Sequence, residues 1–183
     1  MRKLFLSAGG AARGDPAVAA IGVVLSDPQG RVLERLGKCI GRATPEVAEY
    51  RAILEGLRLA LQRQPEELVL FTDNHQVVNQ LNGTLSPRDP AVQHLNKLAQ
   101  ELLRRFPRAR VNYVDHEVSR AARRLAEQAL HEERRTERER QILRQEILAL
   151  LDALSLEDLK RVHAFLLSFQ SEKADAHRSS AGA

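Results

Sequence analysis

The feature that most constrains the fold is a change of hydrophobic period near residue 45. Before it, three short apolar runs at 4–8, 19–25 and 31–40 are separated by turn-forming residues. Short β-rich runs joined by tight turns are typical of an antiparallel meander. The Gly-rich stretch 9–16 is expected to bend the chain after the first strand. After Pro45, apolar residues recur at helical spacing, which indicates a switch to helices.

The second part of the chain alternates helices with strands. Pro45 and Glu46 have the composition of a first helical turn, and apolar residues follow in helical spacing to residue 63. Later expected elements are a buried strand at 68–72, helices at 74–81 and 90–105, a strand at 110–114 and a helix from about Ser119. The order β-β-β-α-β-α-α-β-α predicts an α/β fold with a mixed five-stranded sheet.

The last third has a different composition. Residues 131–144 are dominated by charges of alternating sign, which is typical of a solvated helix surface. Apolar residues then step by 3 and 4 through 143–154 and again through 156–169, so we expect a helical hairpin with an apolar face. The predicted organisation is a domain at 1–130, a charged helix and hairpin at 131–170, and a disordered tail at 171–183.

Charge and composition narrow the classes of function. The net charge is +4, and residues 1–130 carry 19 Lys and Arg against 14 Asp and Glu, which suits a polyanionic partner. Cys39 is the single cysteine, so neither an intramolecular disulfide nor a cysteine zinc site is expected. The N-terminus lacks the apolar run of a signal peptide, and no segment has the ~20 apolar residues of a membrane span. A cytoplasmic protein is therefore expected.

Two acidic residues stand where an α/β fold presents ligands. Glu49 is placed one turn inside the first helix, and Asp73 directly follows the buried strand. Ligands of α/β sheets bind at the carboxyl ends of strands, and carboxylate oxygens are good ligands for Mg²⁺. This pair is the predicted catalytic and metal-binding candidate.

With these positions in view, residues from about 3 to 130 resemble the ribonuclease H type 1 family. The segments that carry the resemblance are 10–16 (GAARGDP), 21–24 (IGVV), 47–52 (VAEYRA), 72–73 (TD), 77–83 (VVNQLNG), 88–90 (RDP) and 124–126 (RLA). The resemblance implies the ribonuclease H-like fold. It also implies cleavage of the RNA strand of RNA–DNA hybrids by two magnesium ions held by four carboxylates.

The chain departs from the family at two of those four carboxylates. Glu49 and Asp73 match the family's helix glutamate and strand-end aspartate, but Gly9 and Arg123 stand at the other two acidic positions. One charge–charge interaction at 4 Å is worth roughly 4 kcal/mol at an effective dielectric of about 20, so replacing an acid by arginine strongly opposes metal binding. We therefore expect impaired or lost cleavage, with at most one weakly bound Mg²⁺.

Retained arginines are the candidates for contact with nucleic acid, either an RNA–DNA hybrid or a related duplex. They are Arg13, Arg42, Arg88, Arg120 and Arg124. A solvated helix face is the alternative interpretation of the arginines near residue 120. Pro45 and Glu46 occupy the positions of two asparagines that contact the minor groove of the hybrid in the family.

Three functions are consistent with this pattern. The first is a ribonuclease H-like protein that binds nucleic acid without metal-dependent cleavage. The second is an active hybrid ribonuclease with a rearranged site, in which Asp115 or Glu117, with help from His116, replaces a lost acid. The third is an assembly module that forms a homodimer through the C-terminal hairpin.

Overall fold

The computed structural model describes residues 3–14 and 17–180. Five strands form one mixed sheet in the order β3-β2-β1-β4-β5. Strand β2 pairs antiparallel with β1 and β3, whereas β4 pairs parallel with β1 and β5. The strands are β1 (Lys3–Arg13), β2 (Val18–Ser26), β3 (Val32–Arg42), β4 (Glu67–Thr72) and β5 (Ala109–Tyr113). The mixed five-stranded sheet that the sequence predicted is confirmed.

Five helices complete the chain. They are α1 (Pro45–Gln62), α2 (His75–Leu81), α3 (Pro90–Leu103), α4 (His116–Asp152) and α5 (Leu156–Ser180). Local sequence explains where the first three begin, because Thr44, Asn74 and Asp89 each accept a hydrogen bond from a backbone N–H of the first helical turn. The cap at Asn74 begins α2 directly after Asp73 and so fixes the backbone beside the candidate site.

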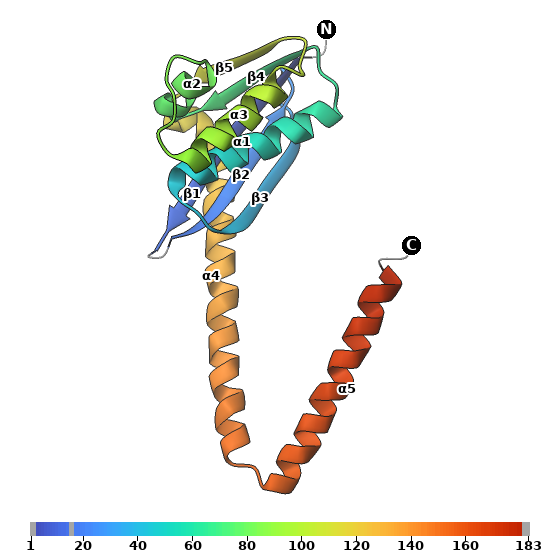
Figure 1. Ribbon diagram of the computed structural model, residues 1–183. Coiled ribbons are helices and arrows are strands. Elements are labelled where there is room, and N and C mark those ends of the chain that lie inside the picture. The colour runs from blue at the N-terminus through green and yellow to red at the C-terminus, as the bar shows by residue number, and fades with distance from the viewer. Residues whose placement is uncertain (1–2, 15–16, 181–183) are drawn as a thin grey trace. The chain divides into compact units, whose positions relative to one another are not determined.

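Helices cover both faces of the sheet (Figure 1). On one face α1 and α3 pack over the main core, in which Leu6, Leu57 and Leu70 are fully buried. On the other face the first turns of α4 cross β2 and β3. A Cβ placed on Gly22 would lie 1.8 Å from the carbonyl oxygen of Ala122, so only glycine permits this close approach. The small residues of β2 thus determine where α4 lies.

A buried hydrogen-bond network joins three helices behind the site. The Tyr50 hydroxyl of α1 donates to Gln80 Oε1 of α2 at 2.7 Å and accepts from Asn96 Nδ2 of α3 at 2.8 Å. Burial raises the pKa of Tyr50 to about 12, so the phenol remains a donor at neutral pH. Buried polar groups that are all paired in this way fix the relative positions of the elements that carry them.

Several boundaries differ from those predicted. The predicted bend after residue 8 is wrong, because β1 continues through Gly9 to Arg13. Pairing with Val18–Gly22 satisfies the backbone there, so the glycines lie within a strand. Helix α4 begins at His116, three residues before the predicted start, and continues without a break through the charged stretch to Asp152.

The chain divides into two compact units, residues 1–135 and 136–183. The first unit ends five residues after the boundary predicted at residue 130, and the second comprises the end of α4 and α5. Helix α5 runs to Ser180, past residue 170 where the predicted hairpin ended, because no Pro or Gly interrupts residues 171–180. Residues 181–183 of the predicted tail lie outside the described residues. None of the helices described has the length and apolar content that crossing a membrane requires.

Candidate functional site

A cavity of about 390 Å³ opens where β1 and β4 approach the N-terminal turns of α1 and α2. Its walls include Glu49, Asp73 and Arg123, so the two retained acids and the arginine predicted near them face one space. Pro45 and Glu46 also line it. The sequence predicted that Glu49 and Asp73 would lie together, and the fold places both at this cavity.

Glu49 is held inside the protein by two donors. Its Oε1 accepts from the Thr72 hydroxyl at 2.5 Å, and its Oε2 accepts from the backbone N–H of Gly10 at 2.7 Å. Burial raises the pKa of Glu49, and the two hydrogen bonds oppose that shift only in part. Both carboxyl oxygens of Glu49 are therefore engaged by the protein itself.

Asp73 is held by three donors, all from the first turns of α4. Asp73 Oδ2 accepts from Ser119 Oγ at 2.8 Å, lies 2.5 Å from His116 Nδ1 and lies 3.3 Å from an Arg123 nitrogen. Burial alone would raise the pKa of Asp73, but the two hydrogen bonds and the charge of Arg123 outweigh it and lower the pKa. The side chain is only 4% exposed, so this oxygen binds the protein itself.

The two substituted positions are neighbours. A Cβ placed on Gly9 would lie 3.6 Å from the backbone nitrogen of Arg123 and 3.9 Å from its Cβ, which is ordinary van der Waals distance. At Gly10 the same atom would lie 2.5 Å from the backbone nitrogen of Glu49. A Cβ is therefore accommodated at residue 9 and not at residue 10. This geometry agrees with the alignment of Gly9 with the missing acid.

The donors present do not fit a pair of magnesium ions. A pair of divalent cations needs several ionised carboxylates. Here both oxygens of Glu49 and one oxygen of Asp73 are occupied by protein donors, and the Arg123 guanidinium brings a positive charge into the cavity. Of the described residues, no three His, Cys, Asp or Glu side chains gather where they could hold a metal ion.

The acids suggested as replacements lie elsewhere. Glu117 forms an ion pair with Arg120 on the surface of α4, and Asp115 is exposed just before that helix. Neither side chain lines the 390 Å³ cavity. His116 contacts Asp73 but is itself 70% exposed, so its ring covers the carboxylate from outside.

Three of the arginines predicted to contact nucleic acid gather around α4. Arg13 and Arg124 line one groove of about 770 Å³, and Arg120 and Arg124 line a second cavity of about 340 Å³ that also includes Arg123. Arg13 lies 3.9 Å from Glu127 in a largely exposed ion pair. Glu127 lines both cavities, Glu132 lines the first and Glu117 the second, against three arginines in each, so arginines exceed acids by one in each cavity. This basic surface adjoins the 390 Å³ cavity through Arg123, which lines that cavity and the second one.

The other two predicted arginines occupy different places. Arg42 is the last residue of β3. It pairs with Val18 of β2, and Val18 pairs with Arg13 of β1, so Arg42 and Arg13 lie two strand spacings apart, about 10 Å. Arg88 lies in the loop between α2 and α3 and lines neither basic cavity. The fold thus places Arg42 at the same end of the sheet as Arg13, and it separates Arg88 from the α4 arginines.

Sequence reasoning missed four participants in the site: Gly10, Thr72, His75 and Ser119. Ser119 could have been found, because His116, Ser119 and Arg123 are spaced 3 and 4 apart on one helix face. His75 lines the cavity and stacks on Tyr113, with ring centroids 3.4 Å apart. No local sequence pattern indicated the backbone N–H of Gly10, because the packing of α1 on β1 brings it to Glu49.

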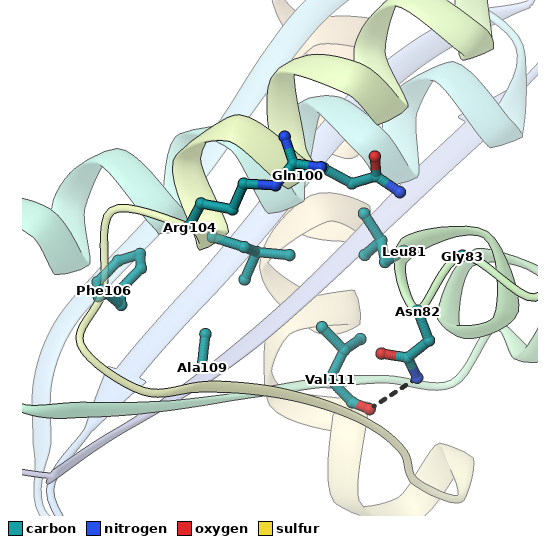
Figure 2. Close-up of a pocket in the computed structure, with 9 residues that line it drawn as sticks. Leu81, Asn82, Gly83, Gln100, Arg104, Phe106, Ala109 and Val111 are labelled. Atoms are coloured by element: carbon teal, nitrogen blue, oxygen red, sulfur yellow. Dashed lines mark hydrogen bonds between the residues drawn. The ribbon is translucent and has the colours of Figure 1, made fainter.

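Another cavity, of about 470 Å³, lies apart from the predicted site residues (Figure 2). Leu81, Phe106 and Val111 supply apolar walls, while Arg104 and Asn82 supply polar groups. The Asn82 amide donates to the Val111 carbonyl at 3.4 Å and ties the end of α2 to β5. No residue of the 390 Å³ cavity belongs to it.

Comparison with known proteins decides the family. A family model described as "Reverse transcriptase-like" matches residues 7–129. The chain belongs to this ribonuclease H-like family. The match ends within α4, before residues 136–183 begin, so it concerns the ribonuclease H-like domain alone.

Two curated relatives share this domain. A Halobacterium salinarum protein named Ribonuclease HI is 35% identical over 121 residues, which are 66% of this chain and 61% of that protein. A bifunctional protein of Mycobacterium tuberculosis is 34% identical over 129 residues, which are 70% of this chain and 35% of that protein. The ribonuclease H-like chain thus matches only part of the length of each relative.

Solved structures agree with the fold. Ribonuclease H1 of H. salinarum aligns with a TM-score of 0.68 at 32% identity, covering 71% of this chain and 98% of that one. The N-terminal ribonuclease H domain of the M. tuberculosis protein aligns with a TM-score of 0.71 at 31% identity, covering 75% and 99%. A ribonuclease H1 from compost, solved with an RNA/DNA hybrid, aligns with a TM-score of 0.65 at 26% identity, covering 70% and 97%.

Proposed function

We propose that this ribonuclease H-like chain binds nucleic acid, an RNA–DNA hybrid or related duplex, without two-metal cleavage. The observation that carries the proposal is the ion pair of 3.3 Å between Arg123 and Asp73. In this pair a guanidinium neutralises the carboxylate that would otherwise hold a cation. Glu49 is the only other retained acid of the family set, and both of its carboxyl oxygens accept hydrogen bonds from the protein.

Binding is assigned to the basic surface around α4, because the cavity itself is not basic. Glu46, Glu49 and Asp73 line the cavity against one arginine, so a phosphate gains little there. Arg13, Arg120 and Arg124 lie outside it, and affinity for a nucleic-acid backbone comes mainly from such charges. A likeness to a ribonuclease H1 solved with an RNA/DNA hybrid supports the choice of ligand.

A cleavage assay on a labelled RNA–DNA hybrid with Mg²⁺ or Mn²⁺ tests the loss of chemistry. The wild-type chain is expected to bind the hybrid and leave it intact. The double variant Gly9→Asp/Arg123→Asp replaces both missing acids where space exists for the first, so it should gain metal-dependent cleavage. Gly9→Ala/Arg123→Ala, which removes the arginine but adds no acid, is the matched control and should remain inactive.

The opposite result would favour the second candidate, an active hybrid ribonuclease. Hydrolysis by the wild-type chain that Asp73→Asn abolishes would contradict our proposal directly. It would mean that Mg²⁺ displaces Arg123 from Asp73 when the hybrid binds. Such an enzyme would need an acid from outside the cavity, and Asp115 and Glu117 are the nearest residues suggested by sequence.

The salt dependence of hybrid binding tests the basic surface. Arg124→Ala should weaken binding to hybrids of any sequence and reduce the slope of log K against log salt by about 1. Arg58→Ala removes an exposed arginine from α1, away from this surface, and should leave the slope unchanged. Equal losses for the two variants would show that the attraction is not localised at α4.

We further propose that residues 136–169 act in assembly and take no part in the nucleic-acid surface. The observation that favours this role is the exposure of large apolar side chains there, among them Leu150, Leu156 and Phe165. Exposed apolar patches of this kind mark interaction surfaces in soluble proteins. A homodimer, suggested by the sequence, is the simplest form of such an assembly.

A further inference from the structure

His75 supplies an exposed aromatic ring to the wall of the 390 Å³ cavity. Its imidazole stacks on the ring of Tyr113, with the two planes 9° apart and the centroids separated by 3.4 Å. One face of the imidazole is thus held by Tyr113. Because the residue is exposed, the other face is available to a further planar group.

The stacked pair is fixed to the body of the ribonuclease H-like domain. Tyr113 is the last residue of β5, is partly buried and packs against the main core. His75 is the first residue of α2 and follows the cap residue Asn74, whose side chain accepts from two backbone N–H groups of that helix. Both rings are therefore held in place before any ligand arrives. A preformed ring loses little freedom on binding, so a group that stacks on it gains most of the stacking energy.

A nucleotide has the shape and charge to use this ring together with the basic surface. Nucleobases are planar and stack on aromatic side chains whatever their sequence. The 390 Å³ cavity adjoins the α4 arginines, because Arg123 lines it and also lines the cavity that contains Arg120 and Arg124. A single sugar separates a base from its phosphate. One nucleotide can therefore place its base at His75 and its phosphate at these arginines.

The charge of the cavity selects the base and not the phosphate. Three carboxyl groups, those of Glu46, Glu49 and Asp73, line it together with one guanidinium. A phosphate is repelled by these acids, whereas a nucleobase carries no charge. The base is thus favoured inside the cavity, and the phosphate is favoured on the α4 surface outside it.

Glu46 distinguishes among the bases. Its Oε1 accepts from Gln80 Nε2 at 3.2 Å, which holds the carboxylate at the wall of the cavity. A carboxylate has about four acceptor positions, so it can accept further hydrogen bonds. Adenine, cytosine and guanine carry an amino group that donates, whereas uracil presents carbonyl oxygens in its place. The cavity therefore favours a base with an amino group.

We propose that the 390 Å³ cavity binds one unpaired nucleobase that carries an amino group, stacked on His75, while the adjoining phosphate binds the α4 arginines. The base must be unpaired, because a base inside a duplex has both faces stacked and its pairing edge occupied. This inference rests on the nucleic-acid binding proposed above, and it narrows the ligand to a hybrid that contains an unpaired nucleotide.

An RNA–DNA hybrid with one unpaired 2-aminopurine nucleotide tests the stacking. This fluorescent isomer of adenine keeps an amino group, and its emission falls when it stacks; the chain has no Trp whose emission would interfere. The wild-type chain is expected to quench the emission. It should also bind this hybrid at least about fivefold more tightly than the fully paired hybrid of the same sequence. EDTA is present throughout, so hydrolysis does not enter the measurement.

Substitutions of His75 identify the ring responsible. His75→Ala should abolish the quenching and reduce the affinity for the hybrid with the unpaired base to that for the paired hybrid. His75→Phe keeps an aromatic ring and should retain both effects, which excludes a general loss of structure as the cause. His94→Ala removes an exposed histidine of α3 that does not line the cavity, so it should behave as the wild type does.

Exchanging the unpaired base tests the amino group. An unpaired uracil should bind about fivefold more weakly than an unpaired adenine, because its carbonyl oxygens face the carboxylate of Glu46. Glu46→Ala should remove this difference. Glu55→Ala changes an acid of the same helix that lies outside the cavity, and it should preserve the difference.

The outcomes separate this inference from the proposed function. A chain that binds neither hybrid contradicts the nucleic-acid binding and the inference together. Equal affinity for the two hybrids, or quenching that His75→Ala leaves intact, overturns the inference and keeps the binding assigned to α4. Equal affinity for unpaired adenine and uracil overturns the selection of an amino group by Glu46.

Discussion

Residues 3–135 and residues 136–180 use their apolar side chains in opposite ways. In the first unit a sheet and three helices bury a core in which Leu6, Leu57 and Leu70 have no exposed surface. In the second unit two helices leave most of their leucines and phenylalanines exposed. The first unit therefore has a close-packed apolar core, which is the main source of stability in a globular domain. The second unit needs the surface of a partner to bury its apolar groups.

Truncating one leucine in each unit tests most directly whether the two units differ in how they use apolar side chains. Leu70→Ala removes fully buried methyl groups and should lower the free energy of unfolding by about 2 to 5 kcal/mol. Leu150→Ala removes groups that are 68% exposed and should leave the unfolding transition of the ribonuclease H-like domain unchanged. Urea denaturation followed by tyrosine fluorescence reports that domain, because both tyrosines, Tyr50 and Tyr113, belong to it.

Equal destabilisation by these two substitutions would mean that the chain unfolds as one cooperative body. The division of the chain at residue 135 would then have no energetic counterpart.

Two adjacent glycines provide a smaller test within the first unit. Gly10→Ala would place a methyl group 2.5 Å from the backbone nitrogen of Glu49, which should cost about 1 to 3 kcal/mol of stability. Gly9→Ala meets its nearest neighbour at 3.6 Å and should change stability by less than about 0.5 kcal/mol. Thermal unfolding of both variants measures the difference. Equal costs would show that α1 is not packed against β1 at this point as described.

Asp73 makes part of the stability of the first unit dependent on pH. Its pKa is lowered in the folded protein, so its contribution is present above the unfolded value near 3.8 and is lost as pH falls through the folded value. Asp73→Asn should cost about 1 to 3 kcal/mol at neutral pH by removing the partner of Arg123 and His116. The gap between variant and wild type should close below pH 4 in urea titrations. A gap that stays constant with pH would contradict the ionised pair.

Glu49 should act in the opposite direction. Its pKa is raised, so the folded state favours the protonated acid and loses stability as pH rises from 4.5 through the folded value. Glu49→Gln can still accept from Gly10 N–H and donate to Thr72, so it should become more stable than wild type at neutral pH and equal to it below pH 4. Melting temperatures across that range measure the effect. A variant that is less stable at neutral pH would show that Glu49 is ionised there.

Sequence patterns were sufficient to predict the architecture, because the spacing of apolar residues distinguishes the strands from the helices. The change of spacing at Pro45, the apolar strand 68–72 and the helices at 74–81 and 90–105 were visible in the sequence, and the structure follows them. The Gly-rich stretch after residue 8 was interpreted wrongly for a physical reason. Glycine weakens any local preference, and only the pairing of 9–13 with β2, a long-range contact, makes it a strand.

The sequence predicted the acidic residues of the candidate site, but it did not predict the hydrogen-bond donors that hold them. Glu49 was predicted from its position in the first helix, and Asp73 from its position at the end of a buried strand. Arg123 was found by counting residues along the motif of the family. The three donors to one oxygen of Asp73 depend on where α4 starts and how it packs on β2. That packing requires the close approach at Gly22, which no single-sequence pattern specifies.

The Tyr50 hydroxyl is hydrogen-bonded to two side-chain amides, and this arrangement affects which substitutions the domain can accept. It joins the helices behind the cavity without help from any ion. Residues at the mouth can therefore exchange acid for glycine or arginine while the frame behind them keeps its shape.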